Sequence, residues 1–318
     1  MKKPNILVVG SLVMDLIVST KKFPELGETV IGTSFATAPG GKGANQAVQA
    51  ARLGAKVTMV GKLGNDSNGD ELIKSLTESG VDVTNIKRTD KAPTAVGNVQ
   101  LQVNEKGTDN RIIVVLGANF EITPEDVAFL KEDIKNYDMV ILQQEIPAEI
   151  NRIVAEYAKA VGVPVMLNPA PYREIEPELL KCLTYISPNE TEVEQMTGIS
   201  PNSNDGLKAC IKALRDTGVA NALITLGKRG CVYSKENDLI FSGSEDCGPV
   251  ADTTAAGDSF VAAFCVALTS GLEVEVALKF ANCTAGITVS RFGAQPSLPN
   301  LTEVKEILEQ KNYNINIF

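Results

Sequence analysis

Short β-branched runs alternate with amphipathic helical segments along most of the chain, and this alternation limits the folds open to it. The predicted strands are Ile6–Val9, Val57–Val60, Met139–Leu142, Val163–Leu167, Ala222–Thr225 and Gly230–Tyr233. The predicted helices are Ala44–Leu53, Gly69–Ser79, Ala148–Val161, Asp205–Thr217, Asp258–Ser270, Val274–Ser290 and Thr302–Gln310. The pattern predicts an α/β fold, a Rossmann-like three-layer sandwich whose central sheet is mostly parallel.

Two regions depart from this alternation. Glu28–Ala38 and Val96–Val115 have the composition of exposed strands, and the second contains a predicted hairpin turn at Asn104–Gly107. Because neither region is long enough to fold alone, we expect one small β-sheet lid made from segments of about 14–38 and 95–116. No repeat or long linker divides the 318 residues, so we interpret the whole chain as a single α/β domain that carries this lid.

Composition excludes several classes of chemistry. The chain has no His, which removes Ser-His-Asp and Cys-His systems, His-ligated zinc and imidazole bases. A general base is therefore expected to be Asp or Glu, with Lys, Tyr and Cys as weaker options. A net charge of −9 argues against nucleic-acid binding, and the lack of an 18-residue apolar stretch argues against a membrane span. The six cysteines form no C-x-x-C pair, which favours buried free thiols and a cytoplasmic location.

Two glycine-rich segments carry the chemistry of the chain. They are Gly40–Asn45 and Asp252–Phe260, and each opens a strongly apolar helix. Free backbone N–H groups and the helix dipole attract phosphate to a glycine-lined helix N-terminus. Neither segment is a Walker A loop or a dinucleotide-binding G-x-G-x-x-G. A carboxylate beside an anion site is unfavourable unless it takes part in the reaction, so the two segments together predict phosphoryl transfer to a hydroxyl.

The residue types suggest how the work is divided. Asp258 is the predicted general base, and the turn Ala255, Ala256 and Gly257 would present amides to the transferring phosphoryl group. The alternative is that Asp258 only caps the helix and that the small residues only allow tight packing. In the other segment, Asn45 offers both a donor and an acceptor to vicinal hydroxyls, whereas a simple glycine turn would not explain the Lys and the Asn.

Seven motifs, in order between about Ile6 and Pro299, resemble those of the ribokinase-like carbohydrate kinase family. They are Gly10-Ser11 followed by Asp15, Gly40–Gln46, Asn168–Pro171, Pro188–Glu192, Thr225–Gly227 with Gly230, Asp252–Asp258, and Gly293–Ser297. The resemblance implies ATP-dependent phosphorylation of D-ribose at its 5-hydroxyl, which gives D-ribose 5-phosphate and ADP. A kinase for 2-deoxyribose, another pentose or a nucleoside is the nearest alternative. A sugar-binding regulator without catalysis is the alternative from another class.

The resemblance also implies which residues bind the sugar and the nucleotide. The sugar set comprises Val13, Met14, Asp15, Gly41, Lys42, Gly43, Ala44, Asn45, Glu145 and Asp258. For Glu145 the alternative is an ordinary exposed acid at a strand end. The nucleotide set comprises Asn189, Glu192, Thr225, Leu226, Gly227, Lys228, Arg229, Gly230, Gly257 and Asn282, the last near adenine. Asn189 and Glu192 would organise Mg²⁺ and phosphate oxygens, although both also suit a plain helix start.

A monovalent cation site is implied beside the anion-binding turn. K⁺ would be held there, mostly through backbone carbonyls, by Asp252, Thr254, Thr288, Arg291, Gly293 and Ser297. By analogy, a homodimer would form through the lid.

Val13 and Ala255 depart from the family pattern, and the pKa of Asp258 bears on its proposed role. Val13 stands where a polar sugar-contacting residue is frequent, so one hydroxyl contact is expected to be absent or made by backbone. Ala255 replaces a frequent Gly in the anion-binding turn, which is tolerable if its φ is negative. For Asp258 we expect an ordinary carboxyl pKa to suffice, because the base takes its proton late.

Overall fold

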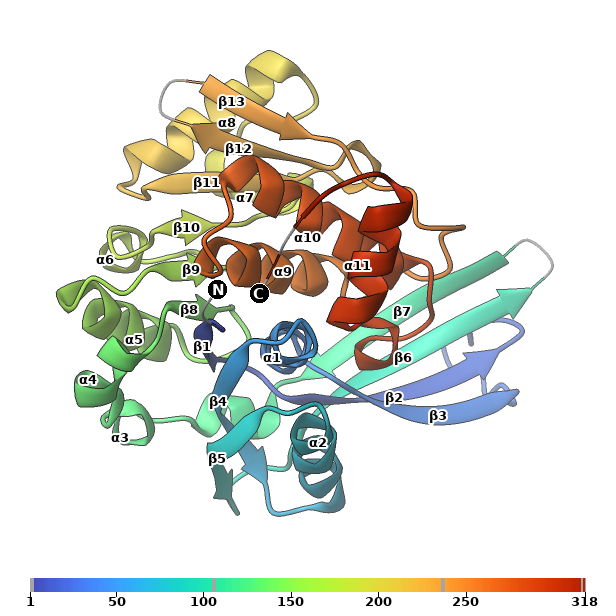
Figure 1. The fold of residues 1–318 in the computed structure, drawn as a ribbon. Coiled ribbons are helices and arrows are strands. Elements are labelled where there is room, and N and C mark those ends of the chain that lie inside the picture. The colour runs from blue at the N-terminus through green and yellow to red at the C-terminus, as the bar shows by residue number, and fades with distance from the viewer. Residues whose placement is uncertain (1–2, 105–106, 236–237, 316, 318) are drawn as a thin grey trace.

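The computed structural model describes residues 3–104, 107–235, 238–315 and 317 (Figure 1). Its main sheet has nine strands in the order β13-β12-β11-β10-β9-β8-β1-β4-β5. Pairing is parallel from β5 to β11 and antiparallel from β11 through β13, which confirms the predicted mostly parallel sheet. The strands are β1 (Asn5–Val9), β4 (Lys56–Gly64), β5 (Asp82–Thr89), β8 (Met139–Leu142), β9 (Val165–Leu167), β10 (Tyr185–Ile186), β11 (Asn221–Thr225), β12 (Cys231–Lys235) and β13 (Asp238–Ser242).

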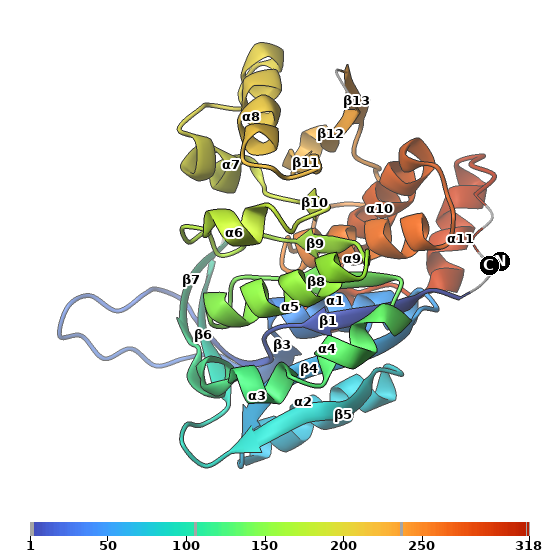
Figure 2. The same ribbon diagram turned by 90° about the vertical axis from the view of Figure 1, so that its left-hand side faces the viewer.

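Helices cover both faces of this sheet (Figure 2). One group packs on one face: α1 (Lys42–Arg52), α2 (Ser67–Glu78), α9 (Ala256–Thr269), α10 (Val274–Val289) and α11 (Leu301–Gln310). The other face carries α3 (Pro124–Val127), α4 (Leu130–Asp133), α5 (Ala148–Ala160), α6 (Pro177–Leu180), α7 (Glu190–Thr197) and α8 (Asn204–Asp216). Four 3₁₀ turns connect elements: η1 (Gly117–Glu121), η2 (Ile134–Asn136), η3 (Gly227–Arg229) and η4 (Gln295–Ser297).

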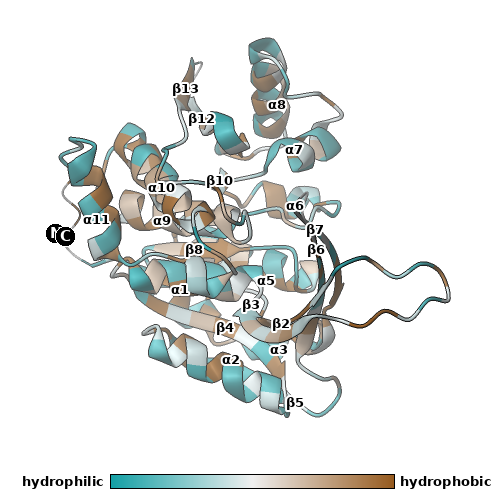
Figure 3. Cartoon of the chain, turned by 90° about the vertical axis from the view of Figure 1, so that its right-hand side faces the viewer, coloured by the Kyte–Doolittle hydropathy of each residue, from teal (hydrophilic) through white to brown (hydrophobic). Residues whose placement is uncertain are grey.

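Strand β1 shows why the chain builds two hydrophobic cores. Successive side chains of a strand point to opposite faces of the sheet. Ile6 and Val8 therefore pack with α1, α9 and α10, whereas Leu7 and Val9 pack with α5 on the other side. Figure 3 shows the result as hydrophobic strands between helices with one polar face, such as α2 and α8.

A second sheet of four strands forms the lid and extends away from the main sheet (Figure 1). Its order is β3-β2-β6-β7, and the strands are β2 (Val13–Thr20), β3 (Ser34–Gly40), β6 (Ala95–Asn104) and β7 (Gly107–Val115). The strands β6 and β7 pair as the predicted hairpin, with the turn residues 105–106 outside the described ones.

The prediction for the first lid segment was wrong in two respects. Residues 28–33 are not a strand, since β3 begins only at Ser34. The strand β2 was missed because it follows β1 after three residues and contains an acid, Asp15, in mid-strand. The strands β5, β10 and β13 were also missed: β5 and β13 lie at the sheet edges with partly exposed side chains, and β10 has only two residues.

The state of the cysteines and the hydropathy of the helices agree with what the composition predicts. All six cysteines are free, and Cys210, Cys231, Cys265 and Cys283 are buried. Within the described ranges, every helix is too short or too polar to cross a membrane.

Candidate active site

The N-termini of α1 and α9 meet beyond the carboxyl ends of the central strands, and Asp258 lies between them. Its side chain is only 5% exposed. Asp258 Oδ2 accepts a hydrogen bond from Asn45 Nδ2 at 2.9 Å, and Oδ1 accepts one from Gln46 Nε2 at 2.9 Å. The interpretation of Asp258 as a helix cap is wrong, because Ala255 is the N-cap residue and no side chain caps α9. The carboxylate is thus held by the other glycine-rich segment.

Burial raises the pKa of Asp258. The charge of Lys42 and the hydrogen bonds from the side chains of Asn45 and Gln46 lower this pKa and only partly offset the effect of burial. The pKa of this carboxyl therefore lies above its ordinary value, which was expected to suffice for the reaction but which burial does not leave in place. For Lys42, burial lowers the pKa, but the carboxylates of Asp258, Glu145 and Glu192 outweigh burial and the pKa is raised. Lys42 is therefore a cation placed among three acids.

The turn before α9 has the geometry of an anion site. The Ala256 amide donates to the Thr253 carbonyl at 3.3 Å. Within the described part of the chain, the amides of Gly257 and Asp258 have no hydrogen-bond acceptor. Helix N-termini with free amides attract anions. An anion bound there would lie beside the Asp258 carboxyl group.

Ala255 does not meet the condition of a negative φ under which alanine would be tolerated here. Its φ is 60° and its ψ is 6°, in the left-handed region that favours glycine. A Cβ in that region costs about 1–2 kcal/mol.

Asn45 presents an unsatisfied acceptor. Its Nδ2 is used by Asp258, but its buried Oδ1 has no hydrogen-bond partner in the structure. A buried polar atom without a partner is costly unless a ligand or water satisfies it. The close approach of the backbone here requires glycine: a Cβ on Gly41 (φ 91°) would lie 2.7 Å from the Val13 nitrogen, and one on Gly43 would lie 2.6 Å from the Ser11 nitrogen.

Glu145 is buried at the same place, with 8% exposed surface. It accepts hydrogen bonds from the Ser11 hydroxyl and, at 3.0 Å, from the Lys42 amide. The alternative of an ordinary exposed strand-end acid is therefore wrong. Glu145 fastens the start of α1 to the loop after β1.

Asp15 enters from the lid, as the third residue of β2. Its carboxylate lies between two neighbouring strands at glycines, because a Cβ on Gly40 or Gly97 would be 2.7 Å or 2.3 Å from its oxygens. Burial, with a smaller contribution from Glu145, raises the pKa of Asp15 to about 6. The neighbouring Val13 and Met14 are almost fully buried.

A cavity of about 180 Å³ connects the base to the residues after β9, β10 and β11. Its lining comprises Lys42, Asn168, Ala170, Ser187, Asn189, Glu192, Thr225, Thr253, Ala255, Gly257, Asp258 and Val261. Asn189 and Glu192 form a reciprocal capping box at the start of α7, as the plain helix-start interpretation predicts. Both side chains nevertheless line the cavity, and the second carboxylate oxygen of Glu192 is outside the capping box.

The residues predicted to bind the nucleotide lie along one edge of the candidate site. Leu226 is buried, η3 carries Lys228 and Arg229, and Arg229 pairs with Glu190 of α7. Gly230 has φ 86°, and a Cβ there would be 2.1 Å from the Ser242 carbonyl oxygen. Asn282 of α10 donates to the Ser242 hydroxyl at 3.0 Å and does not line the cavity.

The predicted cation residues are joined only in part. The Asp252 carboxylate accepts hydrogen bonds from the Thr254 amide at 2.9 Å and from the Gly293 amide at 3.0 Å. The side chains of the other three have separate partners: Thr288 contacts Ser259, Arg291 pairs with Glu303, and Ser297 donates to the Ala294 carbonyl.

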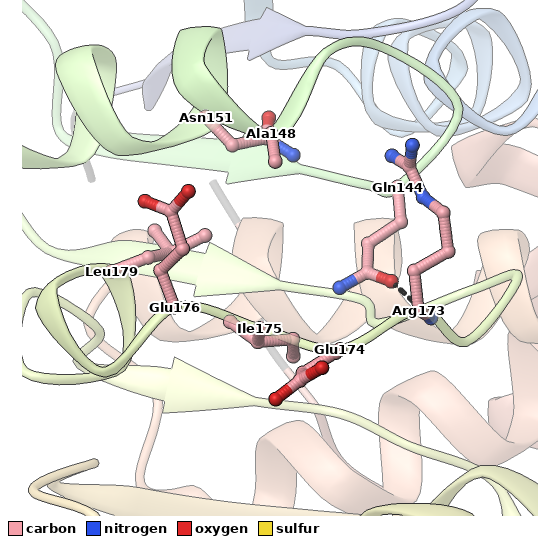
Figure 4. Close-up of a pocket in the computed structure, with 8 residues that line it drawn as sticks. All are labelled: Gln144, Ala148, Asn151, Arg173, Glu174, Ile175, Glu176 and Leu179. Carbon is pink, nitrogen blue, oxygen red and sulfur yellow. Dashed lines mark hydrogen bonds between the residues drawn. The ribbon is translucent and has the colours of Figure 1, made fainter.

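A larger cavity of about 280 Å³ lies elsewhere, around Gln144, Asn151 and Arg173 (Figure 4). The Arg173 amide donates to Gln144 Oε1 at 2.7 Å, and the Arg173 guanidinium donates to the Ile146 carbonyl at 2.7 Å. None of the predicted catalytic residues lines this cavity. The smaller cavity is therefore the candidate active site, because the buried Asp258 and the turn with the free amides line it.

Sequence reasoning missed several residues that hold the site together. Gln46 contacts Asp258, Asn168 and Gln143, and Ser11 contacts Glu145. Gln46 and Asn168 stood inside motifs, but nothing in the sequence indicated which partners their amides would meet.

Comparison with known proteins places the chain in a family. The model of the pfkB family of carbohydrate kinases matches residues 3–301. The chain belongs to the pfkB family. A ribokinase of Bacillus subtilis is 42% identical over 96% of this pfkB chain and 99% of its own length. A deoxyribokinase of Salmonella typhi is 33% identical over 96% and 98% of the two chains. The structure of Arabidopsis thaliana ribokinase complexed with ribose and ATP superposes with a TM-score of 0.89 at 34% identity, over 97% and 99% of the two chains.

Proposed function

We propose that this pfkB-family chain transfers the terminal phosphoryl group of ATP to the 5-hydroxyl of D-ribose. One observation carries the proposal: a buried carboxylate, Asp258, stands beside free amides of α9 and next to the unsatisfied acceptor of Asn45. The names of the relatives support the substrate, since a ribokinase matches at 42% identity and a deoxyribokinase at 33%. 2-Deoxyribose is therefore the second candidate.

In this proposal each group has one task. Asp258 accepts the proton of the sugar hydroxyl, and the amides of Gly257 and Asp258 meet the charge on the transferring phosphoryl group. Asn45 Oδ1 accepts a hydrogen bond from a sugar hydroxyl. Asp15 of the lid and Glu145 of the core bind other hydroxyls from opposite sides.

The nucleotide and the metal would occupy the cavity and the edge beyond it. Thr225, η3 and Gly230 would line the nucleotide, and Lys42 would balance the phosphate charge. Asn189 and Glu192 would suit Mg²⁺ because both carry hard oxygen atoms and both line the cavity beside the anion site. When bound, Mg²⁺ would neutralise phosphate charge and leave proton transfer to Asp258.

A K⁺ site near Asp252 would stabilise the strained turn at Ala255. The Asp252 carboxylate fits a cation site because it already joins the Thr254 and Gly293 segments. Replacing K⁺ by Na⁺ or Tris at fixed Mg-ATP is expected to lower turnover. Turnover indifferent to that exchange would exclude the site.

A homodimer through the lid is supported by apolar residues on its exposed surface, among them Phe35, Ile112, Ile113 and Val115. Light scattering of the wild type and of Ile113→Lys tests it. A monomeric wild-type protein at micromolar concentration would contradict it.

Activity with Asp258→Asn tests the chemical proposal. Loss of the base is expected to lower turnover by about 10²- to 10⁴-fold and to leave ribose affinity within about tenfold. ADP release is measured with ribose, 2-deoxyribose, fructose and adenosine. Near-normal turnover in the variant would remove Asp258 from the mechanism, and ribose binding without ADP release would instead favour a regulator.

A further inference from the structure

Gln46 is the buried partner of Asp258 that no substrate reaches. Its side chain lies on α1, next to Asn45, and is 0% exposed. Gln46 Nε2 donates to Asp258 Oδ1 at 2.9 Å and to Asn168 Oδ1 at 3.2 Å. Gln46 Oε1 accepts a hydrogen bond from Gln143 Nε2 at 2.6 Å. Both amide hydrogens and the oxygen of Gln46 are therefore used.

These partners allow only one orientation of the Gln46 amide. Rotation by 180° would set its oxygen against the oxygens of Asp258 and Asn168, and its NH₂ group against that of Gln143. Asn168 is oriented in turn, because its Nδ2 donates to the Ser187 carbonyl at 2.9 Å. The donor that faces Asp258 is consequently fixed by residues that follow β9 and β10.

Gln143 lies directly after β8 and contacts Gln46 on the side away from Asp258. Its backbone carbonyl accepts a hydrogen bond from Asn151 Nδ2 at 2.6 Å. A Cβ on Gly10 would lie 1.9 Å from Gln143 Oε1, so only glycine after β1 leaves room for this amide. The side chains of Gln143, Gln46 and Asn168 thus form one buried amide relay that ends at Asp258.

Asn45, the other hydrogen-bond partner of Asp258, differs from Gln46 because its side-chain amide is not fully hydrogen-bonded. Its Oδ1 is unsatisfied and faces a ligand in the proposed function, so its position depends on whether sugar is bound. The charged groups that face Asp258 are Lys42 of α1, Glu145 after β8 and Glu192 of α7. Only Lys42 is a cation among them, and nucleotide phosphates would share it.

We infer that Gln46 is a positioning residue, which keeps Asp258 oriented and ionised for proton abstraction whether or not substrate is bound. This inference rests on the proposed function, in which Asp258 is the base. The Gln46 hydrogen bond to Asp258 lowers the pKa of that carboxyl against the effect of burial. Removing the amide therefore raises the pKa further, and the enzyme loses its base at a higher pH.

The test compares Gln46→Leu with a matched control, Gln49→Leu. Gln49 is equally buried on the same helix, where it donates to the Pro299 carbonyl and accepts from the Ser259 hydroxyl without touching Asp258. In Gln46→Leu, kcat is expected to fall about 10- to 100-fold with ribose KM within about threefold, and the acid limb of the kcat/KM profile moves up by about one pH unit. In Gln49→Leu the acid limb stays in place.

A second variant guards against misfolding of the first. Gln143→Leu leaves both hydrogen bonds to Asp258 but removes one of the contacts that orient the Gln46 amide, so a smaller shift in the same direction is expected. An acid limb that moves in neither relay variant, or that moves as far in Gln49→Leu, overturns the inference. Failure of the proposed function looks different: wild-type protein would release no ADP with ribose, or Asp258→Asn would turn over normally, and either result removes the basis of the inference as well.

Discussion

Replacement of Asp15 by Asn is expected to stabilise the protein while abolishing sugar binding. The pKa of Asp15 is raised to about 6 from an ordinary value of 3.8, first by burial and then by Glu145. An acid with a raised pKa in the folded state favours folding when it is protonated, and this advantage is lost as the pH rises from the unfolded pKa through the folded one. At pH 7.5 the ionised carboxylate therefore destabilises the ligand-free protein.

The size of the effect follows from the gap between the two pKa values. About two pH units at 1.36 kcal/mol each give about 3 kcal/mol as an upper bound, since Asp15 retains some solvent contact. For 318 residues this corresponds to a Tm increase of about 4 °C in Asp15→Asn at pH 7.5. At pH 5 the increase should shrink to about half, because the folded wild type is then mostly protonated.

Thermal denaturation at pH 7.5 and pH 5, with and without ribose, measures both effects. Ribose should raise the Tm of the wild type and leave that of Asp15→Asn unchanged. Asp205→Asn serves as a control, because Asp205 is an exposed acid in the first turn of α8. A variant no more stable than the wild type at pH 7.5, or a gain that is equal at both pH values, would refute the reasoning.

Three further substitutions, two at Ala255 and one at Lys42, test the anion-binding turn and the cation near it. Ala255→Gly removes the strain of the positive φ, and part of this gain is offset by the greater backbone entropy of glycine. The free energy of unfolding is therefore expected to rise by up to about 1 kcal/mol, whereas Ala255→Val should lose both stability and turnover. Calorimetry and steady-state kinetics check both expectations. Lys42→Met leaves three carboxylates without their cation. The variant's loss of Tm should be larger at pH 7.5 than at pH 5, because at pH 5 the acids with raised pKa values begin to take up protons. Equal losses of Tm at the two pH values would count against this reasoning.

The sequence was informative where a role depends on residues close together in the chain. Asp258 was singled out because an acid follows a glycine turn before an apolar helix, and the main sheet was predicted because β-branched runs alternate with helical periods. The hydrogen bond between Gln46 and Asp258 joins residues 212 positions apart, so no local pattern predicts it. Asp15 falls within the lid segment predicted at about 14–38, but its place between Gly40 and Gly97 depends on how the lid strands pair, which no local pattern indicates.

Backbone conformation was the other gap. Alanine ordinarily has a negative φ, so nothing in the sequence indicated the positive φ that Ala255 has at the N-cap of α9. The pKa values of Asp258 and Asp15 likewise depend on burial by distant segments, which composition does not reveal.

The junction between the lid and α1 has a mechanical consequence. Strand β3 ends at Gly40 and α1 begins at Lys42, so Gly41 alone links that strand to the helix that carries Asn45 and Gln46. Any rocking of the lid would turn about this residue and pull on the first turn of the helix. Covering the sugar and aiming the base would then be a single movement, with one glycine as its pivot.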